Sequence, residues 1–137
     1  MADEGPPAAV LAAAEIAFGS RSPAPILEAA PVFTLAGARS YWLVGDRGPS
    51  GIVAFARIRD DGQALTIATL RTPAKDCAAA ATNLDEAGAR ALATSYGSSA
   101  AILVQDGPPA RDAWLIRDEP DKPLLLATGG GTYERMR

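Results

Sequence analysis

Residues 51–71 read GIVAFARIRDDGQALTIATLR and contain two β-rich runs on either side of a polar break. The runs cover about 52–59 and 64–71, and the break contains Asp61-Gly62. This dipeptide is typical of a tight hairpin turn, because Gly accepts the positive φ angle that the turn requires. Side chains alternate between the two faces of each run, and one face of the first run becomes polar toward the turn. The stretch therefore predicts an antiparallel β-hairpin.

The segments around this hairpin predict two helices and five or six further strands. Strong helix formers fill residues 8–19 and end at Gly19, a residue type that commonly closes a helix. A second helix is expected from Thr82 or Asn83 to about Tyr96, after an earlier helical turn at 74–81. The other expected strands are 31–36 and 39–45, then 100–107, 112–118 and 122–131, with residues 129–137 as a last strand or a loose tail.

Hairpin-linked strands in two groups, each preceded by a helix, favour an α+β fold with an antiparallel sheet over alternating βαβ units. A chain of 137 residues has the length of one domain. We therefore expect residues 8–137 to form a single globular unit, after a disordered N-terminus at residues 1–7.

The sequence around Trp42 recurs around Trp114, 72 residues later. SYWLVGDRGPSGIVAF, residues 40–55, and DAWLIRDEPDKPLLLA, residues 112–127, each place a Trp in a short apolar run. A charged break with a Pro and a second apolar run follow in both. Two interpretations stay open. One is a tandem duplication with half-repeats at 8–71 and 80–137, and the other is two unrelated amphipathic strands that each anchor a Trp in the core.

A duplication would make each half a helix followed by a meander of three or four strands. Two such halves could join edge to edge into one sheet, with both helices packed on one face and the other face open. Tandem units with this order of elements occur in PepSY-like domains and in protein inhibitors of β-lactamase. That analogy rests on the order of elements and on no shared motif.

Composition and charge limit the partners that we expect. The net charge is −3, from 13 basic and 16 acidic residues, and no basic stripe stands out, so we expect no nucleic-acid partner. Apolar runs such as PLLLA at 123–127 are far too short to cross a bilayer, so we expect no membrane insertion. The oligomeric state is left open.

The N-terminal stretch MADEGPPAAV is acidic and lacks the basic start of a secretory signal. Two compartments agree with this stretch. The protein is either cytoplasmic or the mature form of a periplasmic or secreted protein whose signal peptide ended before Ala2. We slightly favour the exported form.

The residue inventory excludes several kinds of catalytic and metal site. The chain contains no histidine, which excludes a Ser-His-Asp triad, a Cys-His pair and His-ligated zinc. Cys77 is the only cysteine, which excludes iron–sulfur clusters and thiolate zinc sites within one chain. We therefore expect no catalytic residues of these types, no metal and no cofactor.

Three short motifs are open to a functional and a structural interpretation. Cys77 is near Lys75 and could be a reactive thiol, or it could be a small buried side chain. The acidic turn at 118–121 could bind a hard cation or lie free in solvent. Gly129–Gly131 could bind an anion through backbone N–H groups or form a turn. We favour the structural interpretation for each.

Aromatic and arginine side chains are the candidates for partner binding, because interface hot spots favour Trp, Tyr and Arg. We expect Arg57, Arg59 and Arg71 near one another, where together with Arg47 they could form a cationic patch or only protect an exposed strand, and we favour the second interpretation. Burial of both Trp side chains in the core is the favoured alternative to their exposure. The candidate binding residues are Tyr41, Trp42, Arg57, Arg59, Arg71, Trp114 and Tyr133.

These observations favour a non-enzymatic binding module that recognises another protein through a sheet face or hairpin loops, as an inhibitor or accessory factor does. The alternative is a small-ligand carrier, or an unconventional enzyme without histidine, with an apolar pocket between helix and sheet.

Overall fold

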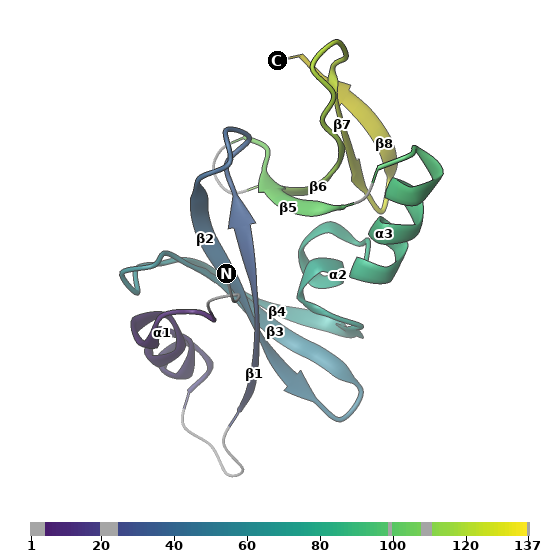
Figure 1. Cartoon of the computed structure of the whole chain (residues 1–137). Coiled ribbons are helices and arrows are strands. Elements are labelled where there is room, and N and C mark those ends of the chain that lie inside the picture. The colour runs from purple at the N-terminus through teal and green to yellow at the C-terminus, as the bar shows by residue number, and fades with distance from the viewer. Residues whose placement is uncertain (1–4, 20–24, 99, 108–110, 137) are drawn as a thin grey trace.

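The computed structural model describes residues 5–19, 25–98, 100–107 and 111–136. These residues form one eight-stranded sheet with the strand order β4-β3-β2-β1-β5-β6-β7-β8, together with three helices (Figure 1). The α+β class is therefore confirmed. Of the N-terminus at residues 1–7 that we expected to be disordered, residues 1–4 lie outside the described residues.

The strands form two meanders of four, and the helices precede them in the chain. The first meander contains β1 (Ile26–Phe33), β2 (Arg39–Gly48), β3 (Gly51–Ile58) and β4 (Ala64–Ala74). The second contains β5 (Ile102–Gln105), β6 (Asp112–Arg117), β7 (Leu124–Thr128) and β8 (Gly131–Arg135). The helices are α1 (Ala8–Phe18), α2 (Cys77–Thr82) and α3 (Glu86–Ser95).

The predicted β3–β4 hairpin is confirmed. Gly62 in its turn has a φ angle of 91°, which side chains with a Cβ rarely adopt. The carboxylate of Asp61 accepts a hydrogen bond of 2.9 Å from the backbone N–H of Gln63, which holds the turn from inside. β4 continues to Ala74, three residues beyond the expected end at 71.

The two meanders meet through a parallel contact between β1 and β5, whereas all other neighbouring strands pair antiparallel. The sheet is thus mixed, although it is mostly antiparallel as predicted. The parallel contact has one register pair, Phe33 opposite Val104. Pro31 lies in β1 opposite Trp42 of β2, at a position where no β5 residue pairs with it. A residue without a backbone N–H is tolerated where one side of the strand is open.

The expected helix at 83–96 and the earlier turn before it are two short helices that meet near Asn83. Asp76 caps α2 by accepting a hydrogen bond of 2.8 Å from Ala79 N–H, and Asp85 caps α3 by accepting one of 2.7 Å from Gly88 N–H. Asn83 ends α2 with a φ angle of 63°, in the left-handed region that Asn tolerates. The chain therefore turns between the two helices.

The helices lie on opposite faces of the first meander, so the expected packing of two helices on one face is not confirmed (Figure 1). α1 places Val10 and Ala14 against Trp42 and Val44. α2 and α3 pack in the main core with Tyr41 and Leu43, the neighbours of Trp42 and Val44 in β2. Because successive side chains of a strand point to opposite faces, these contacts place α1 on one side and α2–α3 on the other.

The pairing of β1 with β2 recurs in β5 with β6, 72 residues later. In β1–β2, Val32 lies opposite Tyr41 and Pro31 lies opposite Trp42. In β5–β6, Val104 lies opposite Ala113 and Leu103 lies opposite Trp114.

Within the described ranges, no helix is long and apolar enough to cross a membrane.

Candidate functional site

A buried polar cluster joins the two meanders. Asp112 at the start of β6 has a fully buried side chain, and its Oδ2 accepts hydrogen bonds from Nε and Nη2 of Arg57 at 2.9 and 2.5 Å. The Tyr41 hydroxyl donates to Oδ1 of the same carboxylate. Nη1 of Arg57 donates to the Thr66 hydroxyl at 3.0 Å. Residues from β2, β3, β4 and β6 therefore share one network, which we call the junction cluster.

The junction cluster is built to hold the meanders together. Burial, followed by the hydrogen bond to Asp112, raises the pKa of Tyr41 well above its ordinary value, so the hydroxyl keeps its proton and remains a donor. Both oxygens of Asp112 are occupied, and Arg57 is 13% exposed at its side chain. Two of the predicted binding residues, Tyr41 and Arg57, are thus brought together, but as parts of a structural network.

Trp42 is buried with 2% of its surface exposed, as the favoured alternative predicted. Its indole Nε1 donates to Oδ1 of Asp60 at 2.7 Å, and the Arg39 guanidinium lies 4.8 Å from the ring centroid. The hydrogen bond from Arg39, and then the one from Trp42, lower the pKa of Asp60. Trp42 therefore packs under α1 and is closed off from partners by an ion pair.

Trp114 is also buried, with 5% of its surface exposed, and its Nε1 donates to the backbone carbonyl of Leu84 at 2.8 Å. Each Trp thus lies against the helical segment that precedes its own meander. Both indoles belong to the core, so neither is available as the exposed interface anchor that the sequence left open.

Tyr133 of β8 belongs to a second polar cluster at the far end of the molecule. Its hydroxyl donates to Oδ2 of Asp106 at 2.6 Å, and Nη1 of Arg135 lies 2.5 Å from Oδ1, though without the alignment of a good hydrogen bond. Burial, followed by the bond to Asp106, raises the pKa of Tyr133 to about 12. Asp106 is 3% exposed, so this cluster also has a structural role.

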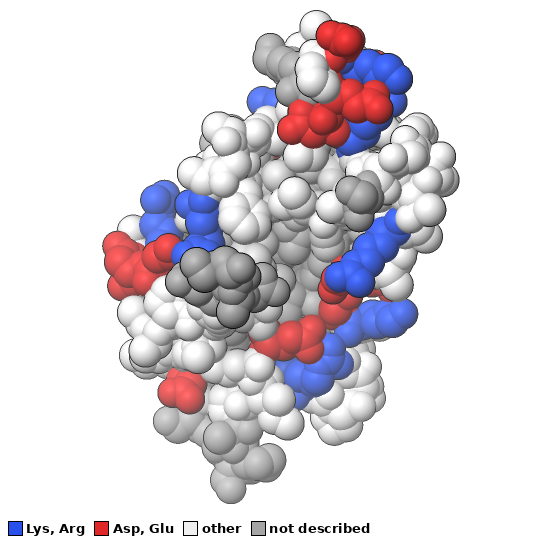
Figure 2. Space-filling view, viewed as in Figure 1, with Lys and Arg blue, Asp and Glu red and all other residues white. Residues whose placement is uncertain are grey.

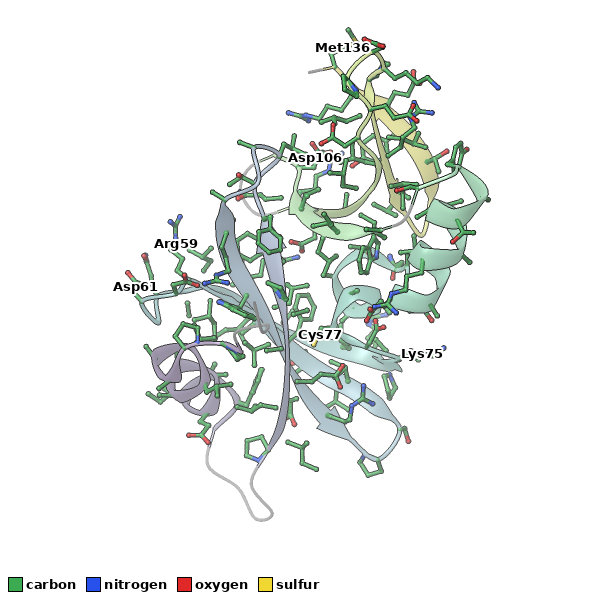
Figure 3. All side chains as sticks on the ribbon, viewed as in Figure 1. Arg59, Asp61, Lys75, Cys77, Asp106 and Met136 are labelled. Carbon is green, nitrogen blue, oxygen red and sulfur yellow. The ribbon has the colours of Figure 1, made fainter. Side chains whose placement is uncertain are left out.

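The arginines that we expected near one another do not form a cationic patch, and the patch was the interpretation that we did not favour. Arg57 lies opposite Thr66 on β4, and Arg71 is five residues further along β4, roughly 17 Å away at the rise of a strand. Arg59 lies exposed at the β3–β4 turn beside Asp61 (Figure 3). Arg47 pairs with Glu28 at 2.7 Å. The arginines therefore lie apart, and two of them are neutralised by carboxylates.

Cys77 is a buried structural residue, as we favoured. Its thiol is 3.2 Å from the carbonyl oxygen of Glu28, and Cys77 lies inside the molecule between the sheet and α2 (Figure 3). Burial, and then the nearby carboxylates of Glu28 and Asp76, raise the pKa of the thiol to about 12. A thiol with this pKa is almost fully protonated at neutral pH, which argues against a nucleophile.

The glycine run forms the β7–β8 turn. Gly129 donates its N–H to the carbonyl of Thr82 at 2.8 Å, and a Cβ on Gly129 would lie 2.5 Å from Asn83 atoms. The turn thus packs against the end of α2, and this N–H is not available to an anion. The acidic turn at 118–121 is exposed. Among the described residues, no group of three or more Asp, Glu, Cys or His side chains could hold a metal ion.

One surface that the sequence reasoning did not single out is an apolar groove on the face that carries α1. We call it the outer groove, with a volume of about 310 Å³. It lies over β5 and β6, beside the β1–β2 loop. Ile102 in it is 42% exposed, and Leu115, which pairs with Ile102, is partly exposed. Its lining residues are Phe33, Thr34, Leu35, Ala36, Gly37, Ile102, Val104, Leu115 and Asp118.

A smaller groove lies between α2 and β4, where the alternative function places a pocket between helix and sheet. Its volume is about 290 Å³, and it is open to solvent rather than enclosed. Leu70, Pro73 and Ala80 contribute to its lining. Small-molecule sites are usually concave cavities of roughly 300–1,000 Å³ that enclose most of the ligand. This open groove is therefore a weak candidate for a small-ligand site. The outer groove is the stronger candidate for a functional surface, as a site of protein contact.

Figure 2 shows charged side chains gathered at the β7–β8 end, at the β3–β4 hairpin and in a third group on the side of α2, with a mainly uncharged surface between the first two groups. Comparisons with family models, with curated proteins and with solved structures found no match to this chain.

Proposed function

We propose that this protein is a non-enzymatic module that recognises another protein through the outer groove. The observation that carries the proposal is the exposure of Ile102 in a groove whose other strand residues are apolar. Apolar residues that are gathered at one exposed site, rather than scattered singly, mark protein interaction surfaces. The recognition element is then a sheet face, one of the two kinds of surface expected from the sequence.

The state of the buried polar groups supports recognition over catalysis. A general acid or base needs a proton-accepting or proton-donating position that a substrate can reach. Asp112 uses both carboxylate oxygens inside the junction cluster, and the Cys77 thiol is buried and protonated. Asp106 is enclosed by Tyr133 and Arg135. The geometry of these groups favours a stabilising role for each.

The shape of the outer groove favours apolar side chains of a protein over a small molecule. Its volume is at the lower end of the range of ligand sites, and it is open along the sheet. A protein partner can place one or two apolar side chains between the β1–β2 loop and Leu115, and its flanking backbone can cover Ile102. Burial of a Leu or Ile side chain stabilises such a contact by about 1.5–3 kcal/mol.

Site-specific photo-crosslinking tests this function. p-Benzoyl-phenylalanine replaces Ile102, and the matched control replaces Ile26, which is 66% exposed and lies on a different strand, outside the groove. We expect ultraviolet light to give covalent protein adducts at position 102 and few at position 26. Equal yields at the two positions, or adducts with small molecules alone at position 102, contradict the proposal, and the second result favours the ligand carrier.

We also propose that the two meanders derive from a tandem duplication. The shared register supports it, since β1–β2 and β5–β6 pair equivalent residues 72 positions apart. The Trp environments support it too, because each indole faces the helical segment before its meander. An experimental structure in which the meanders superpose with Trp42 on Trp114 agrees with the duplication, and a best superposition in another register contradicts it.

A further inference from the structure

The relation between the meanders shows on which face of the second meander no described helix lies. In the first meander, the face that carries Tyr41 and Leu43 is buried in the main core under α2. The residues 72 positions later, Ala113 and Leu115, lie in a separate small cluster with Val104, Leu124 and Leu126. Val104 and Leu115 of this cluster line the outer groove, so the outer groove corresponds to a place that α2 fills on the first meander.

Side chains 72 positions apart differ in exposure, because α2 covers those of the first meander and no described helix covers those of the second. Leu43 has 0% of its surface exposed, whereas its equivalent Leu115 is partly exposed. Ala30 is partly buried against the main core, whereas its equivalent Ile102 is 42% exposed. Leu35 of the β1–β2 loop and Tyr133 cover part of the cluster. In repeat proteins each unit buries its apolar face against the next unit, and a terminal face without such a neighbour is usually polar.

α1 has apolar residues on its outer side as well as on the side that packs against the sheet. Val10 and Ala14 face the sheet and are fully buried. On the outside, Ile16 is 82% exposed, next to exposed Ala12, and Glu15 is the one charged residue of the helix. A helix whose apolar residues lie on both sides is normally in contact with other elements on both sides. α2 is such a helix in this chain, with sheet residues on both meanders in contact with it.

We infer that the partner of the outer groove is a second copy of this chain, whose α1 lies in the groove with Ile16 against Ile102 and Leu115. This inference rests on the proposed function of the outer groove. The groove and α1 lie on the same face of the eight-stranded sheet, over different meanders. Two copies that turn this face toward each other about a two-fold axis place each α1 over the other copy's groove. The contact then closes as a symmetric dimer.

Disulfide trapping between two singly substituted proteins tests the contact. Ile16→Cys and Ile102→Cys chains are mixed and oxidised, and the native Cys77 is buried and does not compete. The matched control mixes Ile26→Cys with Ile102→Cys, because Ile26 is an exposed isoleucine outside both surfaces. We expect a shift from the mass of one chain, 14.1 kDa, to twice that mass in the first mixture only. Equal trapping in both mixtures overturns the inference.

The oligomeric state of the protein gives an independent measurement. We expect a dimer by light scattering, and a loss of the dimer in the Ile16→Asp and Ile102→Asp variants, with circular dichroism unchanged because both side chains are exposed. A protein that is monomeric at all concentrations overturns the inference. If that monomer still forms photo-adducts with a different protein at position 102, the proposed function stands without self-association. If the monomer forms no such adducts, the proposed function and the inferred self-association are both contradicted.

Discussion

Replacing Asp112 with Asn tests whether the junction cluster holds the two meanders together. The substitution keeps the shape of the side chain but removes the negative charge that neutralises Arg57. The Asp112 side chain is fully buried and the Arg57 side chain is 13% exposed, so water compensates the remaining guanidinium charge only in part. Removal of one partner from a buried ion pair costs about 3–5 kcal/mol. We expect about 3 kcal/mol here, because Arg57 retains some contact with solvent.

The assay is equilibrium unfolding in urea, with the free energy of unfolding extrapolated to water. Glu86→Gln is the matched control, since Glu86 forms an exposed ion pair with Arg90 one helical turn away. Such surface pairs contribute about 0.3–0.5 kcal/mol. Tyr41→Phe removes the other donor to Asp112 and is expected to cost about 1–3 kcal/mol. A loss below about 1 kcal/mol for Asp112→Asn, similar to the Glu86→Gln control, would refute this reasoning.

Three further predictions concern Cys77, Gly129 and Tyr133. The Cys77 thiol, with its pKa raised to about 12, is expected not to react with a disulfide reagent at pH 8 until the protein unfolds, and rapid labelling of the folded protein would contradict its burial. Gly129→Ala is expected to destabilise the protein in thermal unfolding because its Cβ would meet Asn83 at 2.5 Å, whereas Gly130→Ala has space and serves as the control. The pKa of Tyr133 is raised from 10.0 to about 12, so its contribution to stability is complete below pH 10 and is lost as the pH rises through 12. Absorbance titration of the Tyr133→Phe variant against the original protein measures this, and a difference between the two proteins that titrates at pH 10 in the folded state would count against it.

Local chemistry allowed much of the fold to be predicted. Asp61-Gly62 placed the hairpin because turn geometry depends on the turn residues themselves. Burial of Trp42 and Trp114 followed from their apolar runs. The helical turn before Thr82 and the helix after it were expected from composition. The separation of the two helices depends on one residue, Asn83, in a left-handed conformation.

Features that depend on long-range pairing could not be predicted. Arg57 and Asp112 are 55 residues apart, so the ion pair that holds Arg57 in the junction cluster has no local signal. The parallel pairing of β1 with β5, which joins the two meanders through one register pair, also has no local signal. Register shifts in the pairing of β3 also place Ile52 in the main core with Phe55, although simple alternation along a strand would put Ile52 on the face of Ala56.

The outer groove could have been suspected from one pattern. Residues 102–104 and 113–116 are apolar on both faces, as is typical of strands buried on both sides. The sequence does not contain enough helices to cover both faces of both meanders. α1 lies on the first meander, and α2 and α3 lie between the first meander and the inner face of the second. The outer face of β5 and β6 is the one that remains.

The most direct test of the central claim is the access of solvent to the isoleucine methyl groups in the dilute protein. A soluble paramagnetic probe broadens methyl resonances in proportion to their exposure. The structure predicts strong broadening for Ile16 and Ile102, which are 82% and 42% exposed, and little for Ile58 and Ile116, which are at most 1% exposed. Protection of Ile102 to the same degree as Ile116 in the dilute monomer would contradict the claim, because it would mean that the chain covers its own outer groove.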